Sequence, residues 1–279
     1  MNQPVPVLDH VVVNVLGELD RASEQYRRLG FQLSERGHHT LGSSNHLAIF
    51  GENYLELLGF EPGRETERAD LWKHPPGLTG LVFKTTDSLA LHTYLANKDI
   101  PVENPAEFSR PVALPDGSHD ASFRVVRLGT QLIPNGRVFF CQHFTPELVW
   151  RDEWRQHPNG VSDIVGFAIA ASEPDRTAAL YRSIFGVHSV TRIQGGFSVQ
   201  AGRATVSILT PDEVAGVFAD AAPASDDTSD RMVALTLKTR SVPVVEALLA
   251  AAGISYAREE DRILVPHWEA EGVALAFVE

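Results

Sequence analysis

The chain repeats one pattern four times along its length. Each copy begins with an apolar, strand-like segment, continues with an amphipathic helix and returns to strand-like sequence. The first and third copies are separated by nearly the same interval as the second and fourth, which indicates a unit that was doubled and then doubled again. A polar residue in one copy that is apolar in the others is therefore a candidate functional residue. The copies begin at residues 8–13, 78–83, 164–169 and 232–237.

Composition narrows the class of protein. A chain of 279 residues can form one large or two ordinary domains. It has no apolar run of about 18 residues and no secretory signal at its start, so we expect a cytoplasmic protein without a membrane span. The single cysteine, Cys141, excludes an internal disulfide. The net charge of −12 argues against a nucleic-acid partner. We expect a monomer or homodimer with a small-molecule ligand.

The repeat predicts where the chain divides. An N-terminal pair of modules occupies residues 1–145, a linker residues 146–160, and a C-terminal pair residues 161–279. Trp150 and Trp154 in the linker are expected to pack the two halves together. Each module should contain one strand, one helix and further strands. The expected modules span about 7–60, 77–145, 161–211 and 231–279; within the first two we predict helices at 18–29 and 88–98, and strands at 8–15, 31–37, 45–50, 54–58, 123–128 and 137–144. Asp87 is the expected N-cap of the second helix, and a long Pro-containing loop is expected before the strand at 123–128.

Several motifs carry a family resemblance. Leu8-Asp9-His10-Val11, Leu29-Gly30-Phe31 and Tyr54-Leu55-Glu56-Leu57 resemble the first module of the vicinal oxygen chelate superfamily, which includes glyoxalase I, extradiol dioxygenases and bleomycin-resistance proteins. Asn45-His46-Leu47 and the run from Phe140 to Trp150 are similar to bacterial glyoxalase-like proteins. The resemblance implies an α+β fold in which four βαβββ modules pair into two half-open, cup-shaped β-barrels. It does not fix the reaction, because this scaffold hosts many chemistries.

The resemblance also implies a metal site. His10, in an apolar strand, and Glu56, in the last strand of the same module, match ligand positions of metal-bearing members. The match to His10 in the second module is Gly80, which cannot coordinate, and the match to Glu56 falls within residues 141–143. Because side chains alternate along a strand, either Cys141 and His143 or Gln142 points inward. We favour His143, which gives a His10, Glu56 and His143 set for Fe²⁺, Mn²⁺, Ni²⁺ or Zn²⁺; the alternative is a buried His–Glu pair.

Other polar residues are candidates for substrate binding. His39, Asn45 and His46 lie where a loop and the next strand meet the expected cup, and alternation allows at most one of two neighbours to face it. Arg124 and Arg127 lie in an otherwise apolar strand and are expected to face opposite ways. An arginine inside the cup needs an anionic partner, either Glu56 or a substrate carboxylate, and we favour Arg124 for the substrate role. Gln142 remains a candidate if it faces inward. The third and fourth modules are apolar at the matching positions, so we expect the C-terminal cup to carry no site.

These residues support more than one function. The first hypothesis is an enzyme in which a divalent metal in the N-terminal cup promotes lyase, isomerase or dioxygenase chemistry, with Glu56 as ligand or base. The second is a protein that binds a small, anionic or aromatic molecule without turnover. The third is a metal-free enzyme that uses Glu56 and His10 as acid and base.

Overall fold

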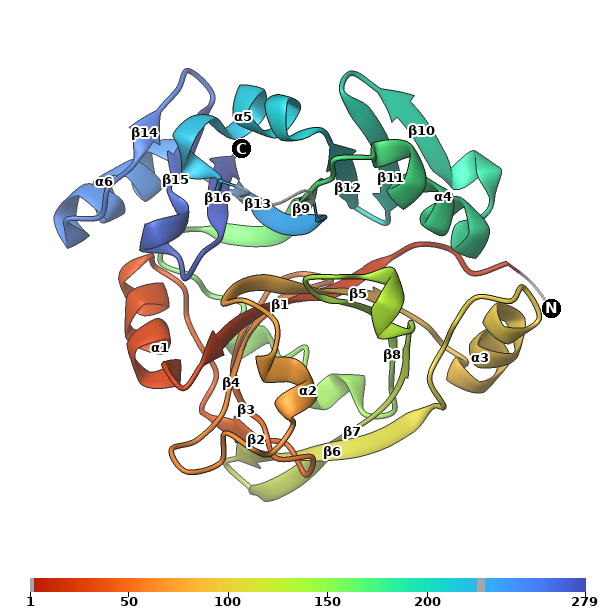
Figure 1. Cartoon of the computed structure of the whole chain (residues 1–279). Helices are drawn as coiled ribbons and strands as arrows, with labels where there is room; N and C mark the ends of the chain where they lie inside the picture. Colours follow the sequence, from red (N-terminus) through yellow and green to blue (C-terminus); the bar gives the residue numbers. More distant parts are fainter. Residues whose placement is uncertain (1–2, 225–228) are drawn as a thin grey trace.

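The computed structural model describes residues 3–224 and 229–279, which form two mixed eight-stranded sheets with helices around them (Figure 1). The first sheet and its helices comprise β1 (Leu8–Leu16), α1 (Leu19–Arg28), β2 (Gly37–His38), β3 (Ser44–Ile49), β4 (Tyr54–Gly59), α2 (Ala69–Trp72), β5 (Gly77–Lys84), α3 (Ser88–Ala96), β6 (Ala106–Leu114), β7 (Gly117–Arg127) and β8 (Arg137–His143). The second comprise β9 (Val161–Ala170), α4 (Pro174–Phe185), β10 (Val190–Ile193), β11 (Gly196–Ala201), β12 (Ala204–Leu209), α5 (Pro211–Phe218), β13 (Arg231–Thr239), α6 (Val242–Ala252), β14 (Ala257–Arg258), β15 (Arg262–Val265) and β16 (Ala274–Val278).

The two sheets have the same strand order. In the first it is β2-β3-β4-β1-β5-β8-β7-β6, and in the second β10-β11-β12-β9-β13-β16-β15-β14. Two strands pair antiparallel at the centre of each sheet, and each of them also pairs in parallel with the last strand of its own module. The first sheet curves until β2 lies near β6, which produces a nearly closed barrel (Figure 1). The predicted α+β fold with two cups is therefore confirmed.

Buried apolar side chains form three clusters. The largest joins the two sheets, and within it Phe83 contacts Phe185 and Phe31 contacts Phe277. The second fills part of the N-terminal cup and the third the C-terminal cup. Alternation explains this division: Val11 and Val13 in β1 face the shared core, whereas Val12 faces the cup. The two cups therefore open on opposite sides of one core.

Local signals place most elements but miss some. The Asp87 side chain accepts a hydrogen bond from the Ala90 N–H, which confirms it as the N-cap of α3. Residues 31–36 are not a strand, and only Gly37–His38 pairs. Strand β6 occupies a segment interpreted as a loop; Pro111 is compatible with it because β6 lies at the edge of the sheet.

The linker tryptophans pack differently from expected. Trp150 and Trp154 lie against the apolar cluster of the N-terminal cup rather than between the halves. The halves are joined by the largest apolar cluster and by hydrogen bonds. Asn53 donates to the Ile164 carbonyl and accepts from the Ile164 N–H, and the Tyr26 hydroxyl donates to the Ala270 carbonyl. In residues 3–224 and 229–279, no helix is long and apolar enough to cross a membrane.

Candidate active site

Strand register places His10 and Glu56 on the concave face of the N-terminal sheet. In the parallel pair β1–β4, His10 lies opposite Tyr54 and Val12 opposite Glu56. His10 and Val12 of β1 and the even-numbered residues of β4 therefore point into the cup. The cavity inside the cup has a volume of about 60 Å³, several times the roughly 10–15 Å³ that one water molecule requires. The cavity is lined by His10, His39, Leu41, Ser43, Asn45, Leu47, Tyr54, Glu56, Leu58, Arg68, Leu71, Phe108, Arg110, Phe123, Val125, Arg127, Arg137, Phe139, Cys141 and Val149.

His10 is held between two carboxylates. Its Nδ1 lies 2.6 Å from Oδ2 of Asp9, and its Nε2 lies 3.8 Å from Oε2 of Glu56. Burial raises the pKa of Asp9, but the adjacent His143 and His10 outweigh burial and hold that pKa well below its usual value. Asp9 is therefore ionised and accepts a hydrogen bond from Nδ1 of His10, which leaves the Nε2 atom of His10 facing Glu56 at the cavity. The ring stacks on Tyr54, with centroids 4.3 Å apart.

Glu56 is oriented by Asn45. Nδ2 of Asn45 donates to Oε1 of Glu56 at 2.6 Å, and the same nitrogen lies 3.2 Å from Nε2 of His39. Burial, opposed in part by Glu56, lowers the pKa of His39 to about 4. His39 is thus a neutral imidazole that accepts at Nε2 and donates from Nδ1 to the Ser43 hydroxyl, 2.8 Å away. This network fixes the Glu56 carboxylate while leaving Oε2 directed toward His10.

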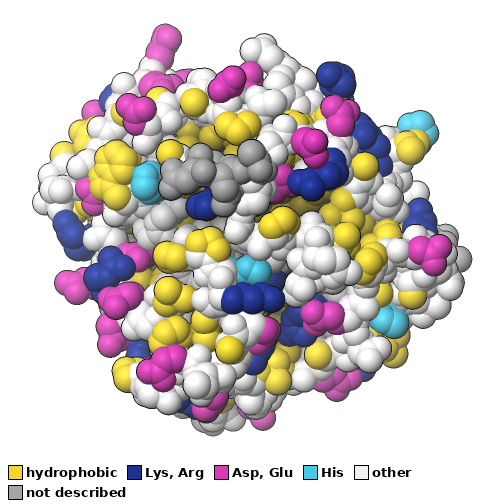
Figure 2. Space-filling view, in the orientation of Figure 1, with side chains coloured by type: hydrophobic (Ala, Val, Ile, Leu, Met, Phe, Trp, Pro, Cys, Tyr) yellow, Lys and Arg dark blue, Asp and Glu magenta, His cyan; other side chains and the backbone are white. Residues whose placement is uncertain are grey.

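Four arginines and a single carboxylate, Glu56, line the cavity. Arg68 is paired with Asp70, and Arg127 lies 4.0 Å from Glu103. Burial lowers the pKa of Arg137 to about 10, with further lowering by Arg127 and Arg68. On the face of the molecule drawn in Figure 2, by contrast, charged side chains of both signs are dispersed. The cup is therefore a cationic pocket in a chain with a net charge of −12.

Only two of the four positions that match the family's metal ligands carry side chains able to coordinate, and both lie in the first module. Gly80 matches His10 in the second module, and it lies opposite Arg137 in β8 as His10 lies opposite Tyr54 in β4. Two residues further along each strand, Phe139 therefore takes the place of Glu56. A Cβ at position 80 would lie 2.5 Å from Cβ of Val12, so no side chain fits there without a shift. The corresponding residues of the C-terminal cup are Gly166, Ser207, Ala234 and Ala276.

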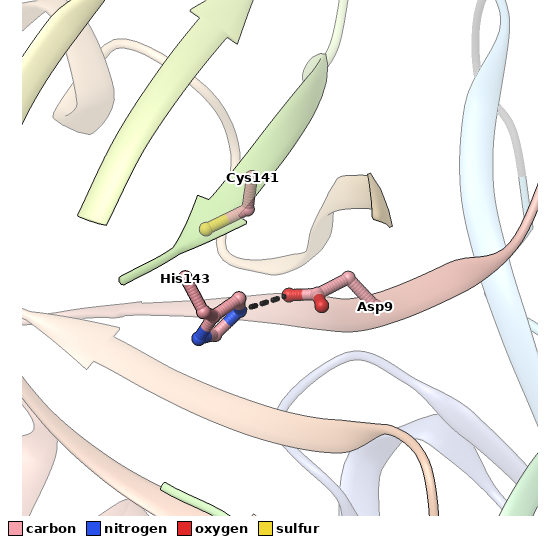
Figure 3. Close-up of side chains that lie close together, drawn as sticks. All are labelled: Asp9, Cys141 and His143. Atoms are coloured by element: carbon pink, nitrogen blue, oxygen red, sulfur yellow. Dashed lines mark hydrogen bonds and ion pairs between the residues drawn. The ribbon is translucent and has the colours of Figure 1, made fainter. Parts of the chain in front are cut away.

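The expected set of His10, Glu56 and His143 does not converge on one point. Nε2 of His143 lies 3.0 Å from Oδ2 of Asp9, at the Nδ1 end of the His10 ring. Glu56 lies at the opposite, Nε2 end of that ring. In the described residues the one group of at least three converging His, Cys, Asp or Glu donors is Asp9, Cys141 and His143, whose ligand atoms lie within 4.8 Å of one another (Figure 3). Oδ1 of Asp9 and Nδ1 of His143 have no hydrogen-bond partner. The donors suit Zn²⁺, although burial raises the pKa of the Cys141 thiol well above its usual value.

Comparison with known proteins places this architecture. A family model described as a glyoxalase-like domain matches residues 8–185. The chain belongs to the glyoxalase-like domain family. No curated protein matches the sequence significantly. Among solved structures, a hypothetical protein from Staphylococcus aureus is similar at a TM-score of 0.67 and 15% identity, covering 98% of this chain and 99% of the other.

Two further solved structures share the fold. A mutant of 4-hydroxymandelate synthase from Streptomyces coelicolor matches with a TM-score of 0.59 and 10% identity over 99% of this chain and 92% of that one. A xylose isomerase-like TIM barrel/4-hydroxyphenylpyruvate dioxygenase fusion protein matches with a TM-score of 0.58 and 14% identity over 100% of this chain and 50% of that one. At such identities the likeness establishes the vicinal oxygen chelate fold alone.

Three candidate substrate residues of this glyoxalase-like chain lie outside the cavity. Gln142 points away from the cup and accepts hydrogen bonds from the N–H and hydroxyl of Ser88, because Cys141 takes the inward position. Arg124 pairs with Glu107 on the outer side of β7, since Phe123 and Val125 face inward. His46 contacts the Ser34 carbonyl. His39 and Asn45 do line the cavity.

Sequence reasoning missed the arginines that do face the cavity. Arg110 lies in β6, which was interpreted as a loop, so no alternation was available to orient it. Arg127 was considered only as the neighbour of Arg124 that faces the opposite way, and Arg137 opens β8 one position before the apolar run. The signal available was the alternation in β7: once Phe123 is inward, Arg127 is inward as well.

Proposed function

We propose that the N-terminal cup is the active site of an enzyme that moves a proton on a small carbonyl-containing substrate, in the manner of an isomerase or lyase. The observation that carries the proposal is the His10–Glu56 pair, whose facing atoms lie 3.8 Å apart at the cavity. Two such groups in hydrogen-bond reach of one substrate are what general acid–base catalysis requires. Tyr54, Asn45 and Asp9 support the pair without competing for its open atoms.

The roles follow from the hydrogen bonds. The Glu56 carboxylate takes a proton from a carbon next to the substrate carbonyl, and Oε2 is the oxygen free to do so. His10, protonated on both nitrogens and stabilised by ionised Asp9, gives its Nε2 proton to the adjacent carbon or oxygen. Glu56 then returns its proton to Nε2 across the 3.8 Å gap, which restores the starting state with no net gain or loss of protons.

Proton exchange tests the proposal without knowledge of the natural substrate. Pyruvate, 2-oxobutyrate and phenylpyruvate carry acidic protons next to a carbonyl, and their replacement by deuterium in D₂O is followed by NMR. We expect the protein to accelerate exchange of at least one, and Glu56→Gln to remove roughly 10²- to 10⁴-fold of that acceleration. Arg124→Gln, outside the cavity, is the matched control. Exchange at the buffer rate, or unchanged exchange in Glu56→Gln, would falsify the proposal.

A second candidate is a metal-dependent lyase, isomerase or dioxygenase. The convergence of Asp9, Cys141 and His143 favours it, and two of the structural neighbours are named as a synthase and a dioxygenase. An ion held there would supply Lewis-acid chemistry, or oxygen chemistry if it is Fe²⁺. Metal analysis of protein purified without chelator or histidine tag tests it. Stoichiometric Fe, Mn, Ni or Zn that Cys141→Val removes would support it, and a metal-free protein with full exchange activity would exclude it.

A further inference from the structure

We infer that the substrate is a small organic carboxylate whose charged group binds Arg110, so that the reacting carbon lies next to Glu56. This inference rests on the proposed function only where it calls the ligand a substrate; the anion site itself does not depend on that function. Arg110 lies in β6 and lines the cavity. It is 3% exposed and, in the described parts of the chain, makes no hydrogen bond or ion pair; its Nη2 is buried without a partner.

A buried and unpaired guanidinium is unusual. Moving such a charge from water into the protein interior costs several kcal/mol unless an anion compensates it. A similar cost arises when one partner of a buried ion pair is removed by mutation. Burial lowers the pKa of Arg110, but a guanidinium remains protonated at any pH at which proteins fold. Glu56 and Tyr54 oppose the effect of burial only in part, and in the described residues no side chain forms a hydrogen bond or ion pair with this guanidinium. A ligand carboxylate, which accepts two parallel N–H bonds from arginine, supplies that compensation.

The local packing preserves this arginine in place. Gly37 lies beside it: a Cβ at that position would be 2.5 Å from Cδ of Arg110 and 2.4 Å from Oδ1 of Asn45. The glycine thus leaves room for both side chains at once. Oδ1 of Asn45 is itself buried without a partner, and the other end of the same amide binds Glu56. Arg110, Asn45 and Glu56 therefore form a row along which the anionic head of a ligand and its neighbouring carbon would lie.

The same strand supplies an apolar wall. Phe108, two residues before Arg110, faces the cavity and stacks on Phe123 with ring centroids 5.2 Å apart. Phe139 also lines the cavity. A cationic anchor beside aromatic faces fits a carboxylate with an apolar body, because the apolar part gains burial while the head meets its charge.

Thermal shift measurements with matched probes test the inference. The probes are butyrate with butyramide and phenylacetate with phenylacetamide, each pair differing in charge but little in shape, at constant ionic strength. Binding to the native state raises the melting temperature. We expect at least one carboxylate to raise it and its amide to leave it unchanged. No shift with either carboxylate, or equal shifts with acid and amide, overturns the inference.

Two variants separate a ligand site from a structural role. Arg110→Met removes an uncompensated buried charge, so we expect the melting temperature of the unliganded variant to rise by roughly 2–4 °C and the carboxylate shift to disappear. Arg124→Met is the matched control on the neighbouring strand and should keep the shift. If Arg110→Met instead lowers the melting temperature and retains the shift, Arg110 is structural and the inference is wrong.

Glu56→Gln separates this inference from the proposed function. The variant lacks the catalytic carboxylate but keeps Arg110, so the carboxylate shift should persist or increase while proton exchange is lost. A wild-type protein that binds carboxylates without accelerating exchange would overturn the proposed reaction and leave the anion site standing. That outcome would identify a protein that binds or sequesters small acids.

Discussion

The two cups of this protein are built on the same strand order but differ in what fills them. In the N-terminal cup, His10 and Glu56 face a cavity that four arginines surround. In the C-terminal cup, the corresponding residues of the third module are Gly166 and Ser207, and small, hydroxyl and apolar side chains such as Ala168, Thr205 and Phe218 line a hollow. One scaffold thus supports a cationic cavity with a His–carboxylate pair on one side and, on the other, a hollow whose described lining contains neither His nor Arg.

The helices that cover the cups explain part of the difference. In the C-terminal half, Val214 and Phe218 of the eight-residue helix α5 pack among the alanines of the cup. In the N-terminal half, α2 is only four residues long and contributes one fully buried side chain, Leu71. A short cover leaves the polar groups of the N-terminal cup accessible to a small ligand. The contrast teaches that the cover helix, as well as the strands, decides which side chains line each cup.

The largest expected effect distinguishes the cups by catalysis. Glu56→Gln should lower the rate of proton exchange by roughly 10²- to 10⁴-fold, because it removes the base. Ser207→Ala, at the corresponding position of the C-terminal cup, should leave the rate unchanged. Exchange kinetics of both variants by NMR check the pair. An equal loss in both would show that the two cups act together.

The next effect concerns the C-terminal cup. Phe218→Ala should destabilise the protein by about 3–5 kcal/mol, because Phe218 is 4% exposed and its loss leaves a cavity among small residues. Urea unfolding measures the change. Proton exchange should continue at the wild-type rate below the transition. A loss of exchange in the still-folded variant would contradict the separation of the cups.

Two buried aspartates should respond oppositely to pH. The two histidines outweigh burial and depress the pKa of Asp9, so its contribution to stability is present above the unfolded pKa of about 3.9 and is lost as pH falls below it. Burial raises the pKa of Asp163, so its contribution is present at low pH and is lost as pH rises through the raised value.

Denaturant unfolding between pH 3 and 7 checks this pair. At pH 7, Asp9→Asn should cost about 3 kcal/mol, since it leaves His10 and His143 without their charged partner. Asp163→Asn should be neutral or slightly stabilising there. A stabilising Asp9→Asn would show that the Asp9 carboxylate is not ionised in the folded protein.

The smallest expected effect is at Cys141. Its counterpart in the C-terminal cup is Val278 by strand register, and Cys141→Val should change stability by less than about 1.5 kcal/mol. Burial, which raises the pKa of this thiol, should also protect it from iodoacetamide at pH 8 until the protein unfolds. Rapid labelling of folded protein would show that the cup opens more widely than the structure indicates.

Much of the candidate site was within reach of the sequence. His10 and Glu56 stand out because they interrupt apolar strands at matched positions, and side-chain alternation predicts that they share a face. The same reasoning failed for Gln142 and Arg124, because the register of β8 and β7 depends on neighbouring strands. A shift of one residue moves every side chain to the other face.

The sequence by itself determined the fourfold repeat and the absence of His and carboxylate residues at the matching positions of the third and fourth modules, because periodicity and residue type are read locally. The pairing of modules into two cups followed from the resemblance to the vicinal oxygen chelate superfamily. Only the tertiary structure revealed Asp9 behind His10, the Asp9–Cys141–His143 group and the unpaired Arg110. The last two depend on strands that are far apart in the chain and meet only when the sheet curves. Charge balance in a cavity is a property of that closure, and no spacing along the chain encodes it.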